Sequence, residues 1–128
     1  MPSAVQVPPV APARPELWRI TDRSAFQELR RHGRRARRGP LTVTWMPPPP
    51  SGTGPLRTRA GFTIGKATGG AVVRNRVRRR LRAALRQLLV EDRLSAGTYL
   101  LGGSRELATM PWSALISLVH DTLTEAQR

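Results

Sequence analysis

The side chains of this 128-residue chain that could do chemistry are arginines, gathered in one short run. Residues 69–89 have the sequence GGAVVRNRVRRRLRAALRQLL, with seven arginines and no carboxylate between positions 74 and 86. Like charges this close repel one another, and bound phosphate groups relieve the repulsion while condensed counterions are released. A merely solvated helix face would normally mix charges of both signs. The run therefore predicts a surface that binds a polyanion.

The charge of the whole chain indicates the same class of partner. There are 22 Lys and Arg against 8 Asp and Glu, a formal net charge of +14, and residues 30–86 hold sixteen basic residues and no acidic one. A field of one sign is typical of proteins that bind nucleic acid or, less often, an anionic membrane surface. All basic residues except Lys66 are arginine, whose planar guanidinium suits phosphate contacts and base stacking. A GC-rich genome that favours arginine codons is the other explanation of this skew.

The sequence predicts no catalytic residue and no metal site in the protein. His32 and His120 are far apart, and the eight carboxylates form no DxD or ExxH pattern or other spaced pair of the kind that holds two catalytic metal ions. Neither a P-loop nor a GxSxG motif is present. The lack of cysteine excludes disulfides, thiolate zinc sites and cysteine nucleophiles.

The length suits one compact domain. Residues 1–16 are rich in proline and are predicted to be a disordered tail, followed by one α/β domain over 17–126 with a proline-rich hairpin loop at 47–55. No apolar run approaches the roughly 18 residues of a membrane span, and the first residues do not have the pattern of a secretory signal. We expect a cytoplasmic protein with no membrane partner.

A helix over about 70–90 must hold the arginines. Its apolar residues recur at helical spacing and form one stripe: Val77, Leu81, Ala84, Leu85, Leu88 and Leu89. Arg76, Arg79 and Arg86 lie on the helix face opposite this stripe, whereas Arg74 lies on the same face as the stripe. Because burial of an unpaired arginine is very costly, Arg74 should open onto a cleft or a ligand, or precede the helix with Asn75 as its N-cap. The glycines at 69–70 either bind phosphate through their N–H groups or simply form the turn.

The other predicted elements surround this helix. Residues 21–33 are predicted to form a short helix capped by Thr21, with Asp22 in its first turn and an end at Gly33, followed by a basic turn at 34–38. Residues 41–46 and 56–66 alternate as two antiparallel strands, with a short extra strand allowed within 56–72, and residues 98–103 form a buried strand. A last helix begins at 109–111, with a core face made of Trp112, Leu115, Ile116, Val119, Leu123 and Ala126. The order α-β-β-α-β-α predicts an α+β sandwich with helices packed on a small sheet.

Two other modes of nucleic-acid binding fit the sequence poorly. A helix-turn-helix needs a second helix close before the basic one, where a strand is predicted instead. No aromatic motif of the RNP type is visible either. Phe26 and Phe62 either flank a groove or pack in the core.

Residues 61–86, GFTIGKATGGAVVRNRVRRRLRAALR, resemble the signature of the bacterial ribonuclease P protein subunit. In that family a strand and a basic pair lead through glycine to Ala-Val-x-Arg-Asn-Arg, an apolar residue, two basic residues and a third basic residue three positions on. Phe26 and the His32-Gly33 pair before a basic stretch extend the likeness, which spans about 17–125. The positions that match the signature are Ala71, Val72, Arg74, Asn75, Arg76, Val77, Arg78, Arg79 and Arg82.

The resemblance implies a function that agrees with the missing active site. In the family the catalyst is an RNA, Mg²⁺ is held mainly by RNA and substrate phosphates, and the ribonucleoprotein is an endoribonuclease that releases the 5′ leader of precursor tRNA. The implied partners are the catalytic RNA of ribonuclease P and the precursor tRNA leader, with no obligate protein partner. The alternatives are a non-catalytic ribosomal or ribosome-assembly RNA-binding protein and a DNA-binding regulator.

The resemblance also implies a fold, and a role for particular residues. The fold is a small, mostly antiparallel sheet of about four strands (ribosomal protein S5 domain 2-like) with a left-handed crossover into the basic helix, although right-handed connections are the general rule. The leader cleft would be lined by Phe26, Arg30, Thr42 and Thr44. The RNA would be bound by Lys66, Arg74, Asn75, Arg76, Arg78, Arg79 and Arg82.

The sequence departs from the family pattern at four positions. Ala67 replaces the second residue of the basic pair, Thr68 replaces an aliphatic residue, and Gly70 replaces an asparagine. Arg30 stands where a second aromatic residue often follows Phe26 by one turn, and an arginine plane can also stack on a base.

Overall fold

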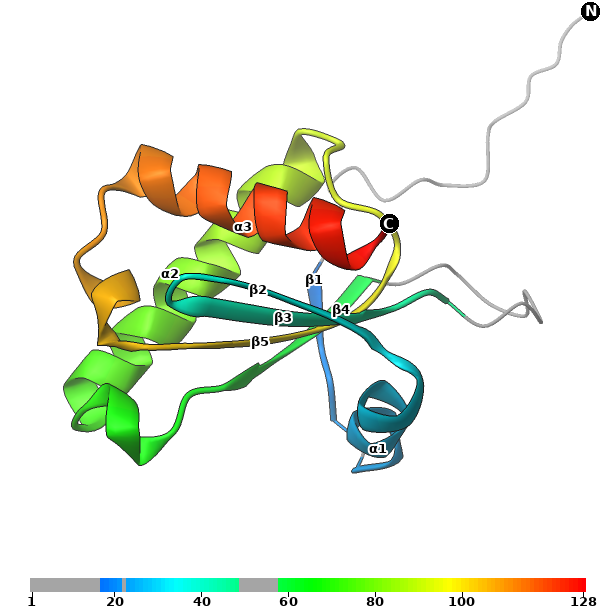
Figure 1. The fold of residues 1–128 in the computed structure, drawn as a ribbon, viewed down its shortest axis with the longest axis horizontal. Helices are drawn as coiled ribbons and strands as arrows, with labels where there is room; N and C mark the ends of the chain where they lie inside the picture. The colour runs from blue at the N-terminus through cyan, green and yellow to red at the C-terminus, as the bar shows by residue number, and fades with distance from the viewer. Residues whose placement is uncertain (1–16, 22, 49–57) are drawn as a thin grey trace, which may run out of the picture.

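Five strands and three α-helices make up the described part of the chain, which comprises residues 17–21, 23–48 and 58–128 of a computed structural model (Figure 1). The helices are α1 (Arg23–His32), α2 (Ala71–Val90) and α3 (Trp112–Ala126), and two short 3-10 helices span Lys66–Thr68 and Arg105–Ala108. The strands are β1 (Leu17–Arg19), β2 (Arg34–Arg38), β3 (Leu41–Met46), β4 (Thr58–Thr63) and β5 (Gly97–Gly103). The predicted tail, the first-turn Asp22 and most of the 47–55 loop lie outside the described residues.

The strands form one mixed sheet in the order β1-β4-β5-β3-β2. β5 is the central strand, antiparallel to β3 and parallel to β4, while β1 pairs parallel with β4 and β2 pairs antiparallel with β3. The predicted antiparallel pairing of 41–46 with 56–66 is therefore wrong, because β5 lies between these strands, and residues 47–55 do not connect a hairpin. The apolar β5 segment takes the central position, where a strand pairs with it on each side.

The basic turn predicted at 34–38 is also wrong, because these residues form edge strand β2. Ala36 is buried against the core while arginines project on both sides of it, a pattern suited to an edge strand whose charge discourages pairing with another chain. Arg38 forms an ion pair with Glu125 of α3 at 3.4 Å, and Arg34 donates to the backbone carbonyl of Arg128 at 2.8 Å. Strands β1 and β2 raise the strand count above the predicted four, and the extra strand allowed within 56–72 is absent from the described part of that range.

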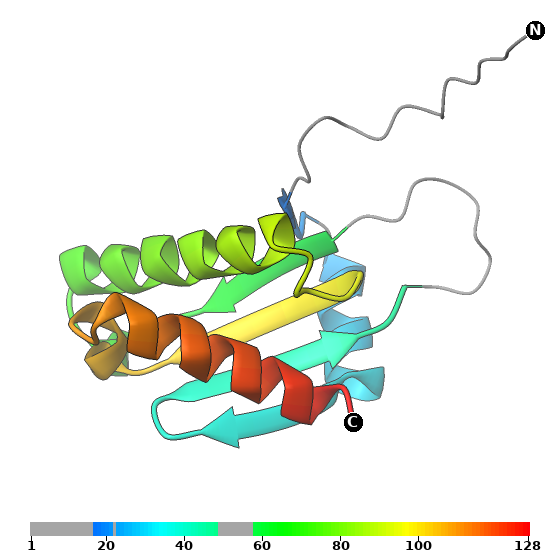
Figure 2. The same ribbon diagram turned by 90° about the horizontal axis from the view of Figure 1, so that it is seen from above.

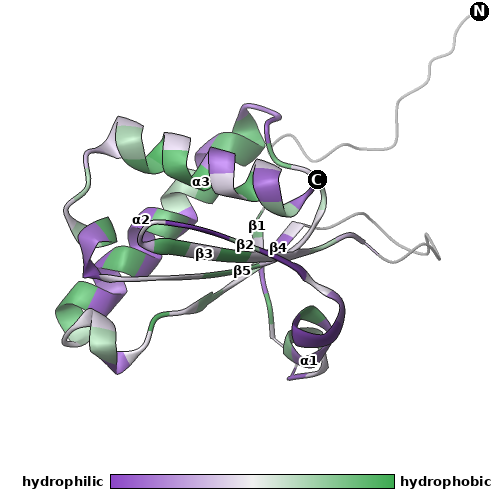
Figure 3. Ribbon diagram, in the orientation of Figure 1, coloured by the Kyte–Doolittle hydropathy of each residue, from purple (hydrophilic) through white to green (hydrophobic). Residues whose placement is uncertain are grey.

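Helices α2 and α3 cover one face of the sheet and build the main core (Figures 1 and 2). Hydropathy colouring shows apolar and polar bands along α2 (Figure 3). The predicted stripe is confirmed: its fully buried members are Val77, Leu81, Ala84, Leu85 and Leu88. On α3 the predicted core face is confirmed except at Trp112, which is 39% exposed because it is the first residue of the helix and lies at the margin of the core.

Helix α2 begins at Ala71, before Arg74. The alternative in which Arg74 precedes the helix and Asn75 is the N-cap is therefore wrong. Gly70, in extended conformation, is the N-cap, and the amide of Arg74 already donates to the Gly70 carbonyl at 3.0 Å. Figure 2 views the sheet from the helix side, with α2 on the viewer's side of the sheet and the parallel strands β4 and β5 pointing the same way. When the picture is turned so that these two strands point upward, β5 lies to the left of β4. The crossover is thus left-handed, as the resemblance implied.

Helix α1 packs on the opposite face of the sheet and covers only one end of it (Figure 1). Its buried residues Ala25 and Leu29 join Ile20 in a small second cluster. The predicted end at Gly33 is confirmed: a Cβ on Gly33 would lie 2.4 Å from the Leu29 carbonyl oxygen and 2.5 Å from Cγ2 of Thr44. Only glycine therefore lets α1 turn directly into β2 while it stays close to β3, and the rest of this face remains uncovered.

Replacing Leu81 with alanine tests the role of the α2 stripe. Because Leu81 is fully buried, the free energy of unfolding should fall by about 2–5 kcal/mol in urea denaturation. Arg79→Ala, two positions away on the exposed side, should change it by less than about 0.5 kcal/mol. Equal losses in the two variants would contradict this assignment of core and surface.

Candidate nucleic-acid interface

An open cleft of about 940 Å³ lies on the sheet face that α1 leaves uncovered. Its floor follows the register of four strands, in which Thr63 pairs with Gly102, Gly102 with Thr42, and Thr42 with Arg37. In the next row, Leu100, Thr44 and Arg35 are neighbours in the same way. The absence of a side chain at Gly102 deepens the floor between the two threonines and provides room for an extended chain.

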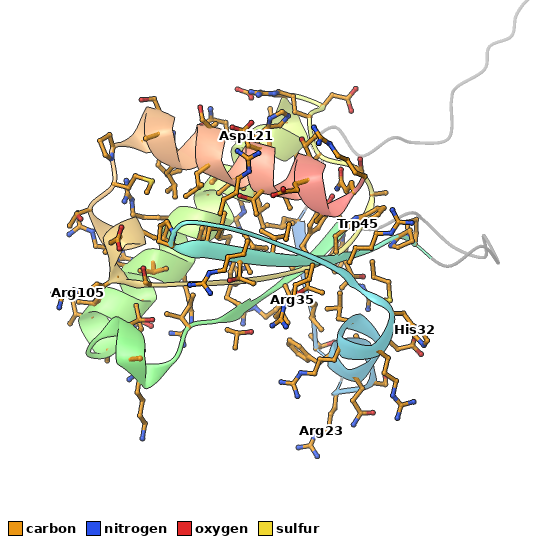
Figure 4. All side chains as sticks on the ribbon, in the orientation of Figure 1. Arg23, His32, Arg35, Trp45, Arg105 and Asp121 are labelled. Atoms are coloured by element: carbon orange, nitrogen blue, oxygen red, sulfur yellow. The ribbon has the colours of Figure 1, made fainter. Side chains whose placement is uncertain are left out.

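Arginines from two elements border this cleft. Arg30 of α1 and Arg35 and Arg37 of β2 are exposed and line it, whereas Glu106 is its one lining carboxylate among the described residues. Figure 4 shows Arg35 on the side of the sheet where α1 lies. The cleft therefore combines a net positive charge with the hydroxyl groups of Thr42 and Thr44.

Three of the four side chains predicted for a leader cleft line this cleft, namely Arg30, Thr42 and Thr44. Phe26 lies on the same face but is half-buried, with its ring against Gly61, where an added Cβ would lie 3.0 Å from Cε1 of the ring. It packs on the α1 cluster and is not among the lining residues.

Arg35 and Arg37 were not predicted to line a cleft, because the predicted basic turn over 34–38 gives their side chains no defined face. The signal that could have identified them is the symmetric pattern of two arginines on each side of Ala36, which is typical of a strand with one buried residue.

A second basic surface lies along α2 and is called here the arginine groove. This groove of about 580 Å³ is lined by Arg19, Val72, Asn75, Arg78, Arg79, Arg82 and Arg86. Four of the predicted RNA-binding residues meet in it, and Arg78 donates to the Asn75 side-chain oxygen at 2.9 Å. Arg19, which β1 contributes, was not predicted, since no local pattern links β1 to a helix more than 50 positions later.

The arginines of this groove lie close enough to repel one another, which makes the charged form of each less favourable. Burial, together with the positive charges of Arg19 and Arg86, lowers the pKa of Arg82 below its usual value. The Arg82 guanidinium lies over the ring of Phe62, 5.3 Å from the ring centroid, and Phe62 faces the core side of the sheet rather than the cleft. A phosphate placed between these guanidinium groups would offset their mutual repulsion, which together with burial lowers this pKa.

The remaining predicted RNA-binding residues lie near the start of α2. Lys66 is exposed in the 3-10 helix before it, and Arg76 is exposed on its outer side. Arg74 is half-buried, and its Nε is buried with no hydrogen-bond partner among the described residues. The expectation that Arg74 opens onto a ligand or a cleft therefore stays a prediction. Its support is that the Nε donor has no hydrogen-bond partner among the described residues.

Arg80 differs from its neighbours because it serves the fold. Its two terminal nitrogens donate to the backbone carbonyls of Leu107 and Met110, and its guanidinium lies over the Trp112 ring, 5.9 Å from the centroid. These bonds fix the segment between β5 and α3 to the side of α2.

No α2 arginine forms an ion pair with a carboxylate in the described part of the chain. Glu91 and Glu125 pair with arginines outside α2, namely Arg93 and Arg38. Within residues 17–21, 23–48 and 58–128, no three His, Cys, Asp or Glu side chains are grouped so that they could hold a metal ion. His32 and His120 belong to helices on opposite faces of the sheet and do not meet. No helix in the described residues has the length and apolar character needed to cross a membrane.

Comparison with known proteins identifies relatives of this chain. The sequence model described as Ribonuclease P matches residues 15–127. The ribonuclease P protein component of Thermobifida fusca is 36% identical over 114 residues, covering 86% of this chain and 76% of that protein. The ribonuclease P protein component of a Synechococcus species is 39% identical over 114 residues, covering 88% of this chain and 84% of that protein.

Solved structures show the same α+β fold. The RNase P protein of Staphylococcus aureus superposes with a TM-score of 0.69 at 18% identity, covering 86% of this chain and 95% of that one. The RNase P protein of Thermotoga maritima gives a TM-score of 0.67 at 16% identity, covering 84% and 96%. These structures support the predicted fold class, and the family model and the sequence relatives show the membership: the chain belongs to the ribonuclease P protein component family.

Proposed function

We propose that this protein binds the catalytic RNA of ribonuclease P and the 5′ leader of precursor tRNA, and so supports endonucleolytic maturation of the tRNA 5′ end. The observation that carries the proposal is the placement of two arginine-lined surfaces on opposite sides of one sheet. One rigid layer can thereby hold two RNA segments at a constant separation. Its role is positioning and charge screening rather than bond cleavage.

The arginine groove is the surface proposed for the catalytic RNA. Its guanidinium groups come from one helix and the adjacent β1, so their spacing is set before the RNA arrives. Folded RNA presents phosphates close together, and each neutralised phosphate releases a counterion. Arg74 is half-buried near the start of the same helix and does not line this groove.

The cleft is the surface proposed for the leader. An extended single strand could lie over Thr42 and Thr44 with its phosphates toward Arg35 and Arg37. Arg30 replaces an aromatic residue of the family pattern and offers a plane for a base. Because such contacts address the backbone and the faces of the bases, they select sequence only weakly.

The described residues do not fit a resident Mg²⁺ ion, because no group of carboxylates or histidines is gathered at either surface. Mg²⁺ takes mainly oxygen ligands and is readily held by phosphates. We therefore propose that any Mg²⁺ is held by the phosphates of the RNA and the substrate. The protein's arginines neutralise further negative charge on these phosphates.

Reconstitution with catalytic RNA tests the function. At a Mg²⁺ concentration at which the RNA alone is slow, the protein should restore cleavage of precursor tRNA at the mature 5′ end, measured on labelled substrate. Protein alone should leave the substrate intact. Binding without a gain in rate would support the alternative of a ribosomal or ribosome-assembly protein, and correct cleavage by RNA-free protein would contradict the proposed division of labour.

The double variant Arg35→Ala/Arg37→Ala tests the cleft. The KM for precursor tRNA should rise about tenfold, which corresponds to about 1.4 kcal/mol, while the KM for a substrate with a one-nucleotide leader should stay the same. Arg38→Ala is the matched control, because Arg38 lies in the same strand but pairs with Glu125 of α3. An equal rise for both substrates would show that these arginines do not contact the leader.

Adjacent positions 79 and 80 separate RNA binding from folding. Arg80→Ala leaves the Leu107 and Met110 carbonyls without their donor, so the free energy of unfolding should fall by about 1–3 kcal/mol. Arg79→Ala should keep the melting temperature but weaken RNA binding and reduce the slope of log K against log salt by about 0.9 per lost phosphate. The reverse result at the two positions would refute the assignment.

A further inference from the structure

Trp112 is a large aromatic side chain left at the surface between α2 and α3. It is 39% exposed, although its neighbours at the same helical spacing, such as Leu115, are fully buried. Its indole N–H donates to the Gln87 side-chain oxygen at 3.1 Å, and the Arg80 guanidinium lies over its ring. The ring is therefore held in one orientation before any partner arrives.

Beside this ring lies a shallow groove of about 310 Å³, called here the tryptophan groove. It is lined by Arg76, Arg79, Arg80, Ala83 and Trp112. Its volume is at the lower end of the range of about 300–1,000 Å³ that is typical of small-ligand sites. The small side chain of Ala83 keeps it open between the arginines and the ring.

The charge of the tryptophan groove restricts the occupant. Arg80 is committed to backbone carbonyls, but Arg76 and Arg79 are exposed and form no hydrogen bond or ion pair within the described part of the chain. No carboxylate lines the groove. An aromatic plane beside free guanidinium groups is the combination that binds an unpaired nucleotide, with the base stacked on the ring and the phosphate on the cations.

Continuity with the arginine groove indicates which RNA supplies this nucleotide. Arg79 lines both grooves, so one RNA can occupy both without a break. The cleft proposed for the leader lies on the opposite face of the sheet. We propose that Trp112, Arg76 and Arg79 form a binding site for a single unpaired nucleotide of the catalytic RNA, an inference that rests on the function proposed above.

Four variants test this site by affinity for the catalytic RNA. Trp112→Leu should raise Kd about 5- to 150-fold, the loss expected for one stacked base, and Trp112→Phe should stay within about threefold of the wild type because it keeps an aromatic plane. Ala83→Leu should also raise Kd, because the larger side chain fills the groove. Position 83 is exposed and leucine is a good helix former, so the helix should tolerate this change. Ala114→Leu, the same change at an exposed position of α3 outside the groove, should leave Kd unchanged.

Two further readouts separate stacking from a structural effect. The slope of log K against log salt should be unchanged in Trp112→Leu, because no phosphate contact is removed. Chemical probing of the bound RNA should show one unpaired nucleotide that becomes reactive with Trp112→Leu and is protected again with Trp112→Phe.

Wild-type Kd values for both Trp112→Leu and Ala83→Leu would overturn the proposal, as would a Trp112→Phe variant as weak as Trp112→Leu. This failure differs from failure of the proposed function. If the wild-type protein binds the catalytic RNA and restores cleavage while these variants behave like it, only the nucleotide site is wrong. If the wild-type protein gives no gain in rate, the proposed function is wrong, whatever Trp112 does.

Discussion

The packing of the apolar stripe of α2 on the sheet is the interaction on which the rest of this structure depends. Seven arginines in thirteen positions repel one another, and in the described residues no carboxylate pairs with them. Burial of Val77, Leu81, Leu85 and Leu88 holds the helix in place despite that repulsion, because each buried aliphatic side chain contributes about 1.5–3 kcal/mol. The core thus stabilises a charge arrangement that is unfavourable until a polyanion binds.

The sheet carries α2 on one face and the cleft on the other. Core residues of β3, β4 and β5 face α2 and α3, and the alternate residues of the same strands form the floor of the cleft. Successive side chains of a strand point to opposite faces, so the same strands pack against α2 on one side and form the cleft on the other. Helix α1 covers one end of the second face, and Gly33 lets it turn into β2 without closing the cleft.

The arginines of α2 are alike in the sequence but differ in what they contact. Arg80 is hydrogen-bonded to two backbone carbonyls and orients Trp112; Arg82 lies over Phe62 with a lowered pKa; Arg76 and Arg79 remain exposed.

The departures from the family pattern also have a structural setting. Ala67 is exposed, Gly70 is the N-cap of α2, and Arg30 borders the cleft.

Local sequence patterns predicted the buried stripe of α2, strands β3 and β5, and the positive charge, because helical and strand periodicity and net charge are properties of neighbouring residues. The end of α2 was predicted in the same way, whereas its first residue was left open between positions 70 and 75. The family signature also indicated the α+β fold and its left-handed crossover. Contacts in the folded chain were needed to show that β5 separates β3 from β4, that residues 34–38 form an edge strand, and that Arg19 joins the arginine groove. The exposure of Trp112 and the commitment of Arg80 were likewise decided there. These features depend on contacts between segments far apart in the chain, and an alternating or helical pattern does not specify which distant segment covers it.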